Sequence, residues 1–181
     1  MNKIIISLLL CVCAGFSHAQ SVLIRTNMGD ITVQMEPKSP ISVKNFLSYV
    51  DSGFYNGLIF HRVINNFMIQ GGGFDANMQE KATLAPITNE SNNYVRNERG
   101  TLAMARTNNP NSATSQFYIN LKKNGALDYR FGKPGYAVFA HVTSGMDIVD
   151  KIAKVQTGNR GRHGDVPEKA VLIIEAKRLS E

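Results

Sequence analysis

The chain has 181 residues, of which 43% are hydrophobic and 19% charged, and it carries a formal net charge of +6 at pH 7. This length is typical of one globular domain that buries about 70% of its unfolded surface and folds without a disulfide or metal, and the composition argues against disorder. The basic residues are scattered along the chain, so we expect no nucleic-acid partner although the charge is positive.

Residues 1–19 have the three parts of a secretory signal peptide. Lys3 gives a positive start, residues 4–16 are almost wholly apolar, and small residues stand at the −3 and −1 positions of a cleavage site after Ala19. The apolar run is shorter than the roughly 20 residues of a membrane-spanning helix, which disfavours the alternative of a retained anchor. We therefore predict a mature domain over residues 20–181 that is exported to the periplasm and has no membrane association after cleavage.

Both cysteines lie inside this predicted signal. An exported domain without cysteine has no disulfide, no thiol nucleophile and no redox motif. The remaining histidines, His61, His141 and His163, show no spacing typical of metal ligands. We therefore expect neither a metal nor another cofactor.

The first elements of the mature domain are a hairpin and a helix. Residues 22–26 and 31–35 are apolar segments on either side of a turn that contains glycine, as in a β-hairpin. Ser39 suits the cap of a helix and Pro40 its first position. Apolar residues then recur at near-helical spacing up to Gly53, where we expect the helix to end.

The rest of the chain is dominated by short strands. They are predicted at residues 58–64, 67–70, 101–105, 117–120, 137–142 and 170–179. Residues 74–100 are polar and irregular, with one short strand expected near residues 85–88. A second helix is expected after Ser144 as its cap, and Gly158 ends that region. The basic, glycine-rich residues 160–163 are interpreted as a solvated loop.

Many short strands with only two helices favour an antiparallel β architecture. We predict a closed barrel, because closure removes the edge strands that otherwise invite aggregation. The two helices would then cover the open ends.

Common catalytic motifs are absent from the sequence. The glycines of residues 71–73 are not followed by Lys-Ser/Thr and do not open a helix, so we favour a tight turn after a strand over a phosphate-binding loop. The chain has no Gly-x-Ser-x-Gly elbow, and nothing in it indicates a hydrolase.

Residues 60–73 are the most informative segment. Two short apolar strands flank an Asn-Asn turn and end at a glycine stop, with Arg62 and Gln70 placed among the apolar positions. Polar groups fixed within an apolar surface are typical of a ligand site. However, strand alternation does not place Phe67 and Gln70 on the same face. The residues alone therefore leave two interpretations open, a binding site or a core hairpin with Arg62 at the surface.

At these residues the chain resembles the cyclophilins, a family of peptidyl-prolyl cis–trans isomerases (rotamases). Residues 55–72, with Phe-His-Arg-Val-Ile followed by Phe-Met-x-Gln-Gly-Gly, fit the family signature. Further blocks agree at residues 100–106 with 115–120 and at residues 127–128 with 136–139. The similarity extends from about Val22 to Leu179 and is strongest to bacterial members.

The resemblance implies a mainly β fold, a closed eight-stranded antiparallel barrel capped by two α-helices, with the site on its outer face. By matched position, Arg62 and Gln70 are the expected catalytic residues, Gln70 on the substrate carbonyl side, and His61 is a structural neighbour. The expected substrate-binding residues are Phe67, Met68, Tyr118 and Leu127 in the proline pocket, Ala105, Arg106 (through its backbone) and Gln116 in the peptide groove, and Tyr136 at the rim.

The implied function is isomerisation of X–Pro bonds in proline-containing polypeptides during the folding of exported proteins. Arg62 would donate to the prolyl nitrogen while the apolar pocket holds the proline ring. The alternative is a proline-peptide binding module or chaperone in which catalysis is incidental. We expect a monomer.

The chain departs from the best-known family pattern at several points. Ala126 stands where drug-sensitive members carry tryptophan, which predicts weak cyclosporin binding. Tyr118 replaces a phenylalanine and adds a hydroxyl that needs a partner. Residues 129–135 resemble an insertion, and residues 108–114 are slightly extended.

Overall fold

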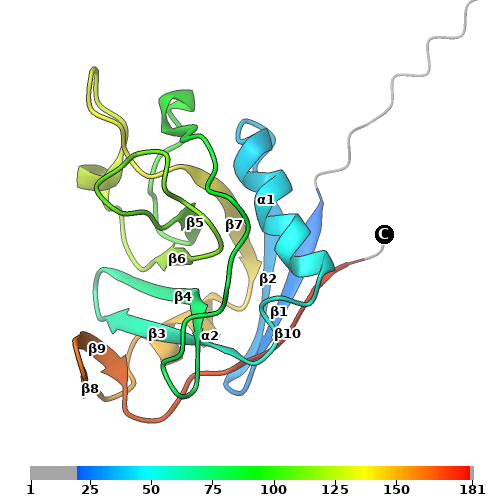
Figure 1. Cartoon of the computed structure of the whole chain (residues 1–181), viewed down its shortest axis with the longest axis vertical. Coiled ribbons are helices and arrows are strands. Elements are labelled where there is room, and N and C mark those ends of the chain that lie inside the picture. The colour runs from blue at the N-terminus through cyan, green and yellow to red at the C-terminus, as the bar shows by residue number, and fades with distance from the viewer. Residues whose placement is uncertain (1–19, 180–181) are drawn as a thin grey trace, which may run out of the picture.

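The computed structural model describes residues 20–179, so the predicted signal peptide lies outside the described residues (Figure 1). The strands are β1 (Ser21–Thr26), β2 (Gly29–Met35), β3 (Leu58–Ile64), β4 (Met68–Asp75), β5 (Thr101–Met104), β6 (Phe117–Asn120), β7 (Val138–Ser144), β8 (Thr157–Arg160), β9 (His163–Pro167) and β10 (Ile173–Arg178). The α-helices are α1 (Pro40–Asp51) and α2 (Met146–Ile152), and short 3₁₀ turns lie at Ser91–Asn93 (η1) and Gly125–Leu127 (η2).

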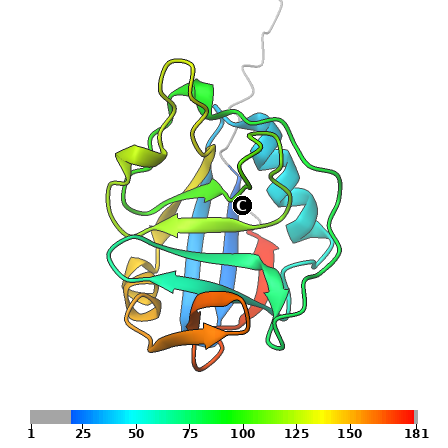
Figure 2. The same cartoon turned by 60° about the vertical axis from the view of Figure 1, so that its left-hand side comes forward.

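Eight of the strands form one antiparallel sheet in the order β10-β1-β2-β7-β5-β6-β4-β3. Its two outer strands approach each other through a bridge between Ile59 and Leu172 and through a hydrogen bond of 2.9 Å from the Phe60 amide to the Val171 carbonyl. The sheet is therefore a nearly closed barrel, and Figure 2 shows α1 and α2 on opposite sides of it. The predicted eight-stranded antiparallel barrel with two helices is confirmed.

The barrel interior is an aromatic core anchored by α1. Phe46 of this helix lies 5.0 to 5.5 Å, between ring centroids, from Tyr55, Phe117 and Phe139. Aromatic rings prefer such tilted and edge-on contacts to face-to-face stacking. At the other helix, Val149 is fully buried against the same core. The helices thus bury their apolar faces on a core made mostly by the strands.

The start of α1 is stabilised from a distant part of the chain. Ser39 occupies the predicted cap position, but its hydroxyl donates to the Val138 carbonyl and does not cap the helix. The buried carboxylate of Glu90 instead accepts hydrogen bonds from the Ile41 amide (2.9 Å) and from the amide and hydroxyl of Ser42 (2.7 Å each). An anion at a helix N-terminus satisfies free amides and complements the helix dipole.

Two other local predictions are wrong. Ser144 ends β7, and the residue before α2 is Gly145, whose φ of 89° lies in the left-handed region that favours glycine. The strand expected near residues 85–88 is reduced to one isolated bridge between Ile87 and Ala113. Most of this segment is exposed, so it lacks the buried face that a strand pairing would need.

The predicted solvated loop over residues 160–163 is largely exposed and contains the turn of a two-stranded hairpin. The hairpin itself, β8–β9, was not predicted, and it packs beside β3 (Figure 2). Only Val166 and Pro167 of the hairpin are buried. Because its strands have no apolar alternation, the usual sequence signal of a half-buried strand is missing.

Candidate active site

The pairing of β3 with β4 brings Arg62 opposite Gln70. Residues directly opposite each other share one face of a sheet, so both side chains lie on the same side. The register of the β3–β4 pairing shifts on both sides of Phe60, which changes the direction of the side chains in this part of β3. Phe67 lies in the turn before β4 begins, where strand alternation does not apply. This explains how Phe67 and Gln70 reach a common site although their spacing argues against it.

A hollow of about 210 Å³ lies on the outer surface of the barrel at this point. Its lining residues are Arg62, Phe67, Met68, Gln70, Ala105, Arg106, Tyr118, Leu127 and Tyr136. The structure therefore brings together all but one of the predicted site residues, and we call this hollow the proline pocket. The remaining residue, Gln116, lies next to this hollow, and its side-chain oxygen accepts a hydrogen bond of 2.9 Å from the side-chain nitrogen of Gln70.

The floor of the proline pocket is an apolar cluster separate from the barrel core. It consists of the buried residues Met68, Ala103, Tyr118 and Val138, with the partly buried Ile64, Phe67, Val95, Ala105, Leu127 and Tyr136 packed around them. Such a surface can hold an apolar ring, while Arg62 and Gln70 add polar groups at one edge.

A polar network beneath the floor fixes the Tyr118 ring. Its hydroxyl donates to the Asn97 side-chain oxygen at 2.8 Å, and Asn97 donates from its backbone and side-chain nitrogens to Asp128 at 2.7 and 3.1 Å. Burial raises the pKa of Tyr118 well above its usual value of 10.0, so the hydroxyl stays protonated as a donor. Asn97 and Asp128 were not predicted, although the extra hydroxyl indicated that a partner was needed.

Arg106 contributes a side chain to the pocket wall as well as the predicted backbone. Its guanidinium lies 4.4 Å from the centre of the Tyr136 ring. It also donates to the carbonyls of Thr107 (2.8 Å), Pro134 (2.9 Å) and Gly135 (3.2 Å). A cation over an aromatic face is attracted by the ring. Arg106 thus ties the segment before Tyr136 to the pocket.

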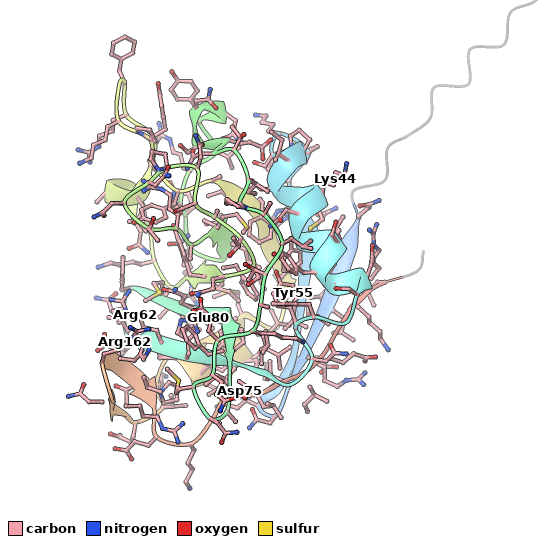
Figure 3. All side chains as sticks on the ribbon, in the orientation of Figure 1. Lys44, Tyr55, Arg62, Asp75, Glu80 and Arg162 are labelled. Atoms are coloured by element: carbon pink, nitrogen blue, oxygen red, sulfur yellow. The ribbon has the colours of Figure 1, made fainter. Side chains whose placement is uncertain are left out.

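Arg62 is oriented by the unpredicted β8–β9 hairpin. Its Nε lies 3.6 Å from the Asp165 carboxylate, and both side chains are about half exposed. Asp165 has a φ of 59°, a left-handed conformation that aspartate tolerates better than most residues. The ion pair uses Nε and leaves the terminal guanidinium nitrogens to act as donors. Figure 3 shows Arg162 of the same hairpin near Arg62, and both line one hollow.

The glycine stop predicted at residues 71–73 is wrong, because β4 continues through these glycines to Asp75. A Cβ atom at Gly72 would lie 2.9 Å from the Tyr55 ring, and one at Gly73 would lie 2.6 Å from the Gln116 side chain. Side chains therefore approach the backbone of Gly72 and Gly73 closely. Gly73 leaves the space in which Gln116 lies beside Gln70.

Gly73→Ala is expected to lower kcat/KM for a prolyl peptide about two- to tenfold, the effect of losing one hydrogen bond. The added methyl would displace the Gln116 side chain and break its bond to Gln70. The measurement is isomerase kinetics together with the melting temperature, which should change little because a flexible side chain can move. Gly158→Ala, where a Cβ would come no closer than 3.9 Å to its neighbours, is the control. Equal kinetics in the two variants would contradict the role of the Gln70–Gln116 pair.

His61 is buried and packs against Phe74, with 4.7 Å between ring centres. Burial lowers the pKa of His61 from 6.5 to about 4, and the nearby His163 and Arg62 act in the same direction. His61 is therefore neutral at pH 7, which is consistent with its expected structural role. Its Nδ1 has no hydrogen-bond partner within the described residues.

This burial predicts a pH-dependent stability. The unfolded chain binds a proton at His61 more readily than the folded chain, so the free energy of unfolding should fall as the pH drops from 6.5 towards 4. The expected loss is about 2–4 kcal/mol. Urea unfolding across this range measures it, and His61→Gln should remove most of this loss whereas His141→Gln, at an exposed position, should not. If the free energy of unfolding depends on pH equally in both variants, His61 is not the cause of the loss.

None of the helices within residues 20–179 combines the length and hydrophobicity needed to cross a bilayer. Over the same residues, His, Cys, Asp and Glu side chains form no group of three or more that could hold a metal ion.

Comparison with known proteins gives one consistent result. A family model described as cyclophilin-type peptidyl-prolyl cis–trans isomerase/CLD matches residues 21–178. A peptidyl-prolyl cis–trans isomerase of Acinetobacter baylyi is 58% identical over 157 residues, which are 86% of this chain and 84% of the relative. Peptidyl-prolyl cis–trans isomerase B of Escherichia coli is 55% identical over 165 residues, 88% of this chain and 99% of the relative.

Solved structures agree with the sequence relatives. A cyclophilin-type peptidyl-prolyl cis–trans isomerase of Cryptosporidium parvum superposes with a TM-score of 0.73 at 25% identity, covering 91% of this chain and 99% of that one. The same protein, crystallised in the presence of the dipeptide Ala-Pro, gives a TM-score of 0.72 over 90% of this chain and 100% of that one.

Proposed function

Because this chain belongs to the cyclophilin-type peptidyl-prolyl cis–trans isomerase family, we propose that it isomerises X–Pro bonds with Arg62 as the catalytic donor. The observation that carries the proposal is the position of Arg62 at the edge of an apolar pocket with Gln70 directly opposite. This arrangement offers a surface for a proline ring and a cation beside it.

The chemistry requires only that rotation about one amide bond becomes easier. Conjugation gives the peptide bond a rotation barrier of about 18–20 kcal/mol. In the twisted transition state the prolyl nitrogen becomes pyramidal and gains a lone pair that accepts a hydrogen bond. A donor aimed at this nitrogen stabilises the transition state more than the ground state, which raises turnover. We assign this role to the terminal nitrogens of Arg62.

The other site residues hold the substrate while the bond rotates. The apolar floor would fix the proline ring, so that the part of the chain before it turns. Gln70 donates one amide hydrogen to Gln116 and keeps a second for the carbonyl that precedes proline. Ala105 and the Arg106 backbone would border the peptide groove.

The proposed setting is the periplasm, where the enzyme would assist the folding of exported proteins as a monomer. The signal-like pattern of residues 1–19 supports export. Uncatalysed prolyl isomerisation takes about 10–100 s at room temperature and can limit folding.

The small side chain of Ala126 leads to a proposal about inhibition by cyclosporin. Ala126 is exposed in η2 and lines the hollow that adjoins the proline pocket, next to Leu127, which lines both. A small side chain offers little apolar area to a large cyclic peptide. We expect cyclosporin to inhibit weakly in an isomerase assay and Ala126→Trp to strengthen inhibition. Nanomolar inhibition of the unchanged protein would contradict this expectation.

The test of the proposed function uses protein expressed from the full sequence and purified after processing. Refolding of a protein limited by prolyl isomerisation should be accelerated by catalytic amounts, in parallel with binding of a prolyl peptide. Acceleration only at stoichiometric amounts would instead indicate a binding module or chaperone.

A further inference from the structure

A second hollow of about 440 Å³ adjoins the proline pocket. The two hollows share Arg106, Leu127 and Tyr136. The other lining residues of the second hollow are Asn108, Pro110, Ala126, Asp128, Arg130, Lys133, Pro134 and Gly135. Most of them belong to residues 108–114 and 129–135, the two segments that the family resemblance indicates as extended. The hollow is therefore formed mainly by these two loops.

Residues 129–135, which we call the basic arm, stand out from the body of the protein (Figure 1). At the tip, Arg130 and Lys133 exchange backbone hydrogen bonds of 3.1 and 2.7 Å around a turn that contains Gly132. At the base, Gly135 donates to the Ser91 hydroxyl at 3.0 Å and accepts from the Asn89 side chain at 3.1 Å. With the bonds from Arg106 to Pro134 and Gly135, these contacts close the tip of the arm and hold its C-terminal end to the body of the protein.

The two cations of the basic arm, Arg130 and Lys133, destabilise the arm by their mutual repulsion. Arg130 and Lys133 are a directly opposed pair, so their side chains share one face, and like charges in such a pair are destabilising. Neither forms an ion pair within residues 20–179. Asp128 carries the single carboxylate among the lining residues, and its Oδ1 is held by Asn97. Counting Arg106, the hollow has three cations against one anion, a formal charge of +2.

We propose that this hollow binds an acidic side chain of the substrate, located after the isomerised proline. The inference rests on the proposed function, because it assumes that a prolyl peptide occupies the neighbouring pocket. Arg130 and Lys133 then determine substrate preference without taking part in bond rotation.

The direction of the substrate follows from which residues the hollows share. Gln70, Gln116 and Ala105 belong to the side proposed to bind the chain before proline, and none of them lines the second hollow. Of the three shared residues, Leu127 and Tyr136 do not line the hollow around Gln70, Ala105 and Gln116, so they form the other wall of the proline pocket. A chain that leaves the proline ring over this wall enters the basic hollow.

The test compares prolyl peptides that carry Glu or Gln at the first, second or third position after proline. Exchange NMR at low salt measures kcat/KM, and one Glu peptide should be preferred about twofold to fivefold over its Gln partner. The preference should disappear in the double variant Arg130→Gln/Lys133→Gln, while its kcat/KM for the Gln peptides stays unchanged. It should also weaken at 1 M salt, where charges are screened within about 3 Å.

The control removes two cations elsewhere. Lys44 lies on α1, well separated from Arg62 in Figure 3, and Lys154 follows α2. Lys44→Gln/Lys154→Gln has the same net charge as the double variant and should keep the full preference for Glu. Loss of the preference in this control would reduce the effect to the overall charge of the protein and overturn the proposal.

Three results separate this inference from the proposed function. Isomerisation without preference for Glu, or a preference that survives in the Arg130→Gln/Lys133→Gln variant, overturns the inference alone. If no peptide is isomerised, the proposed function fails. The Kd values of the Glu and Gln peptides then test the inference separately. Tighter binding of a Glu peptide that is lost in the Arg130→Gln/Lys133→Gln variant would still support the site.

Discussion

Arg62→Lys is expected to lower kcat/KM for a prolyl peptide about 10²–10³-fold, the effect of removing one donor from a preorganised transition-state site. Lysine keeps the positive charge but loses the planar set of donors that reaches the prolyl nitrogen while Nε pairs with Asp165. Peptide binding should change much less, because the apolar floor stays intact. Steady-state kinetics with a peptide-binding titration measure both quantities.

The control for this variant is Arg162→Lys. Arg162 lies near Arg62 and lines the neighbouring hollow but is not among the residues of the proline pocket. Its replacement keeps the charge and changes no residue of the proline pocket, so kcat/KM should stay within about twofold. An equal loss in both variants would mean that the loss does not come from the donor geometry of Arg62 in particular.

Glu90→Gln is expected to destabilise the fold by about 2–3 kcal/mol. One carboxylate now accepts bonds from the Ile41 amide and from the amide and hydroxyl of Ser42. An amide of the same shape keeps one accepting oxygen and presents a donor to a donor at the buried start of α1. Urea unfolding at pH 7 measures the change in the free energy of unfolding.

The matched control is Glu168→Gln at an exposed position, which should change the stability by no more than about 0.5 kcal/mol. Glu90 lines neither the proline pocket nor the hollows beside it, so kcat/KM of the folded variant should be close to that of the unchanged protein. Stability within error of the control would show that Glu90 is not needed to start α1.

The barrel could be predicted because its strands appear in the sequence as short apolar segments. Apolar segments between turns marked eight of the strands, and the spacing after Pro40 marked α1. The cap of α1 could not be predicted in this way, because Glu90 reaches it from 49 residues away in the chain, near a 3₁₀ turn in a polar segment. The β8–β9 hairpin was missed because a strand pair with exposed faces shows no apolar alternation.

The residues alone predicted only part of the site. Arg62 and Gln70 were conspicuous among apolar neighbours, but their convergence with Phe67 depends on a shifted register and a turn, and neither is visible in a periodic pattern. The family resemblance supplied the remaining pocket residues. Two partners act beneath or beside the site: Asn97 comes from an irregular segment, and Asp165 from a strand without apolar alternation. Only the fold brings them close to the pocket residues.

The most direct test of the account is exchange NMR on a prolyl peptide at saturating concentration, with the unchanged protein and Arg62→Ala side by side. The unchanged protein should accelerate cis–trans exchange without altering the isomer ratio. Arg62→Ala should bind the peptide with similar affinity while the exchange rate falls towards the uncatalysed value. Exchange by Arg62→Ala at nearly the rate of the unchanged protein would contradict the assignment of Arg62 as the catalytic donor.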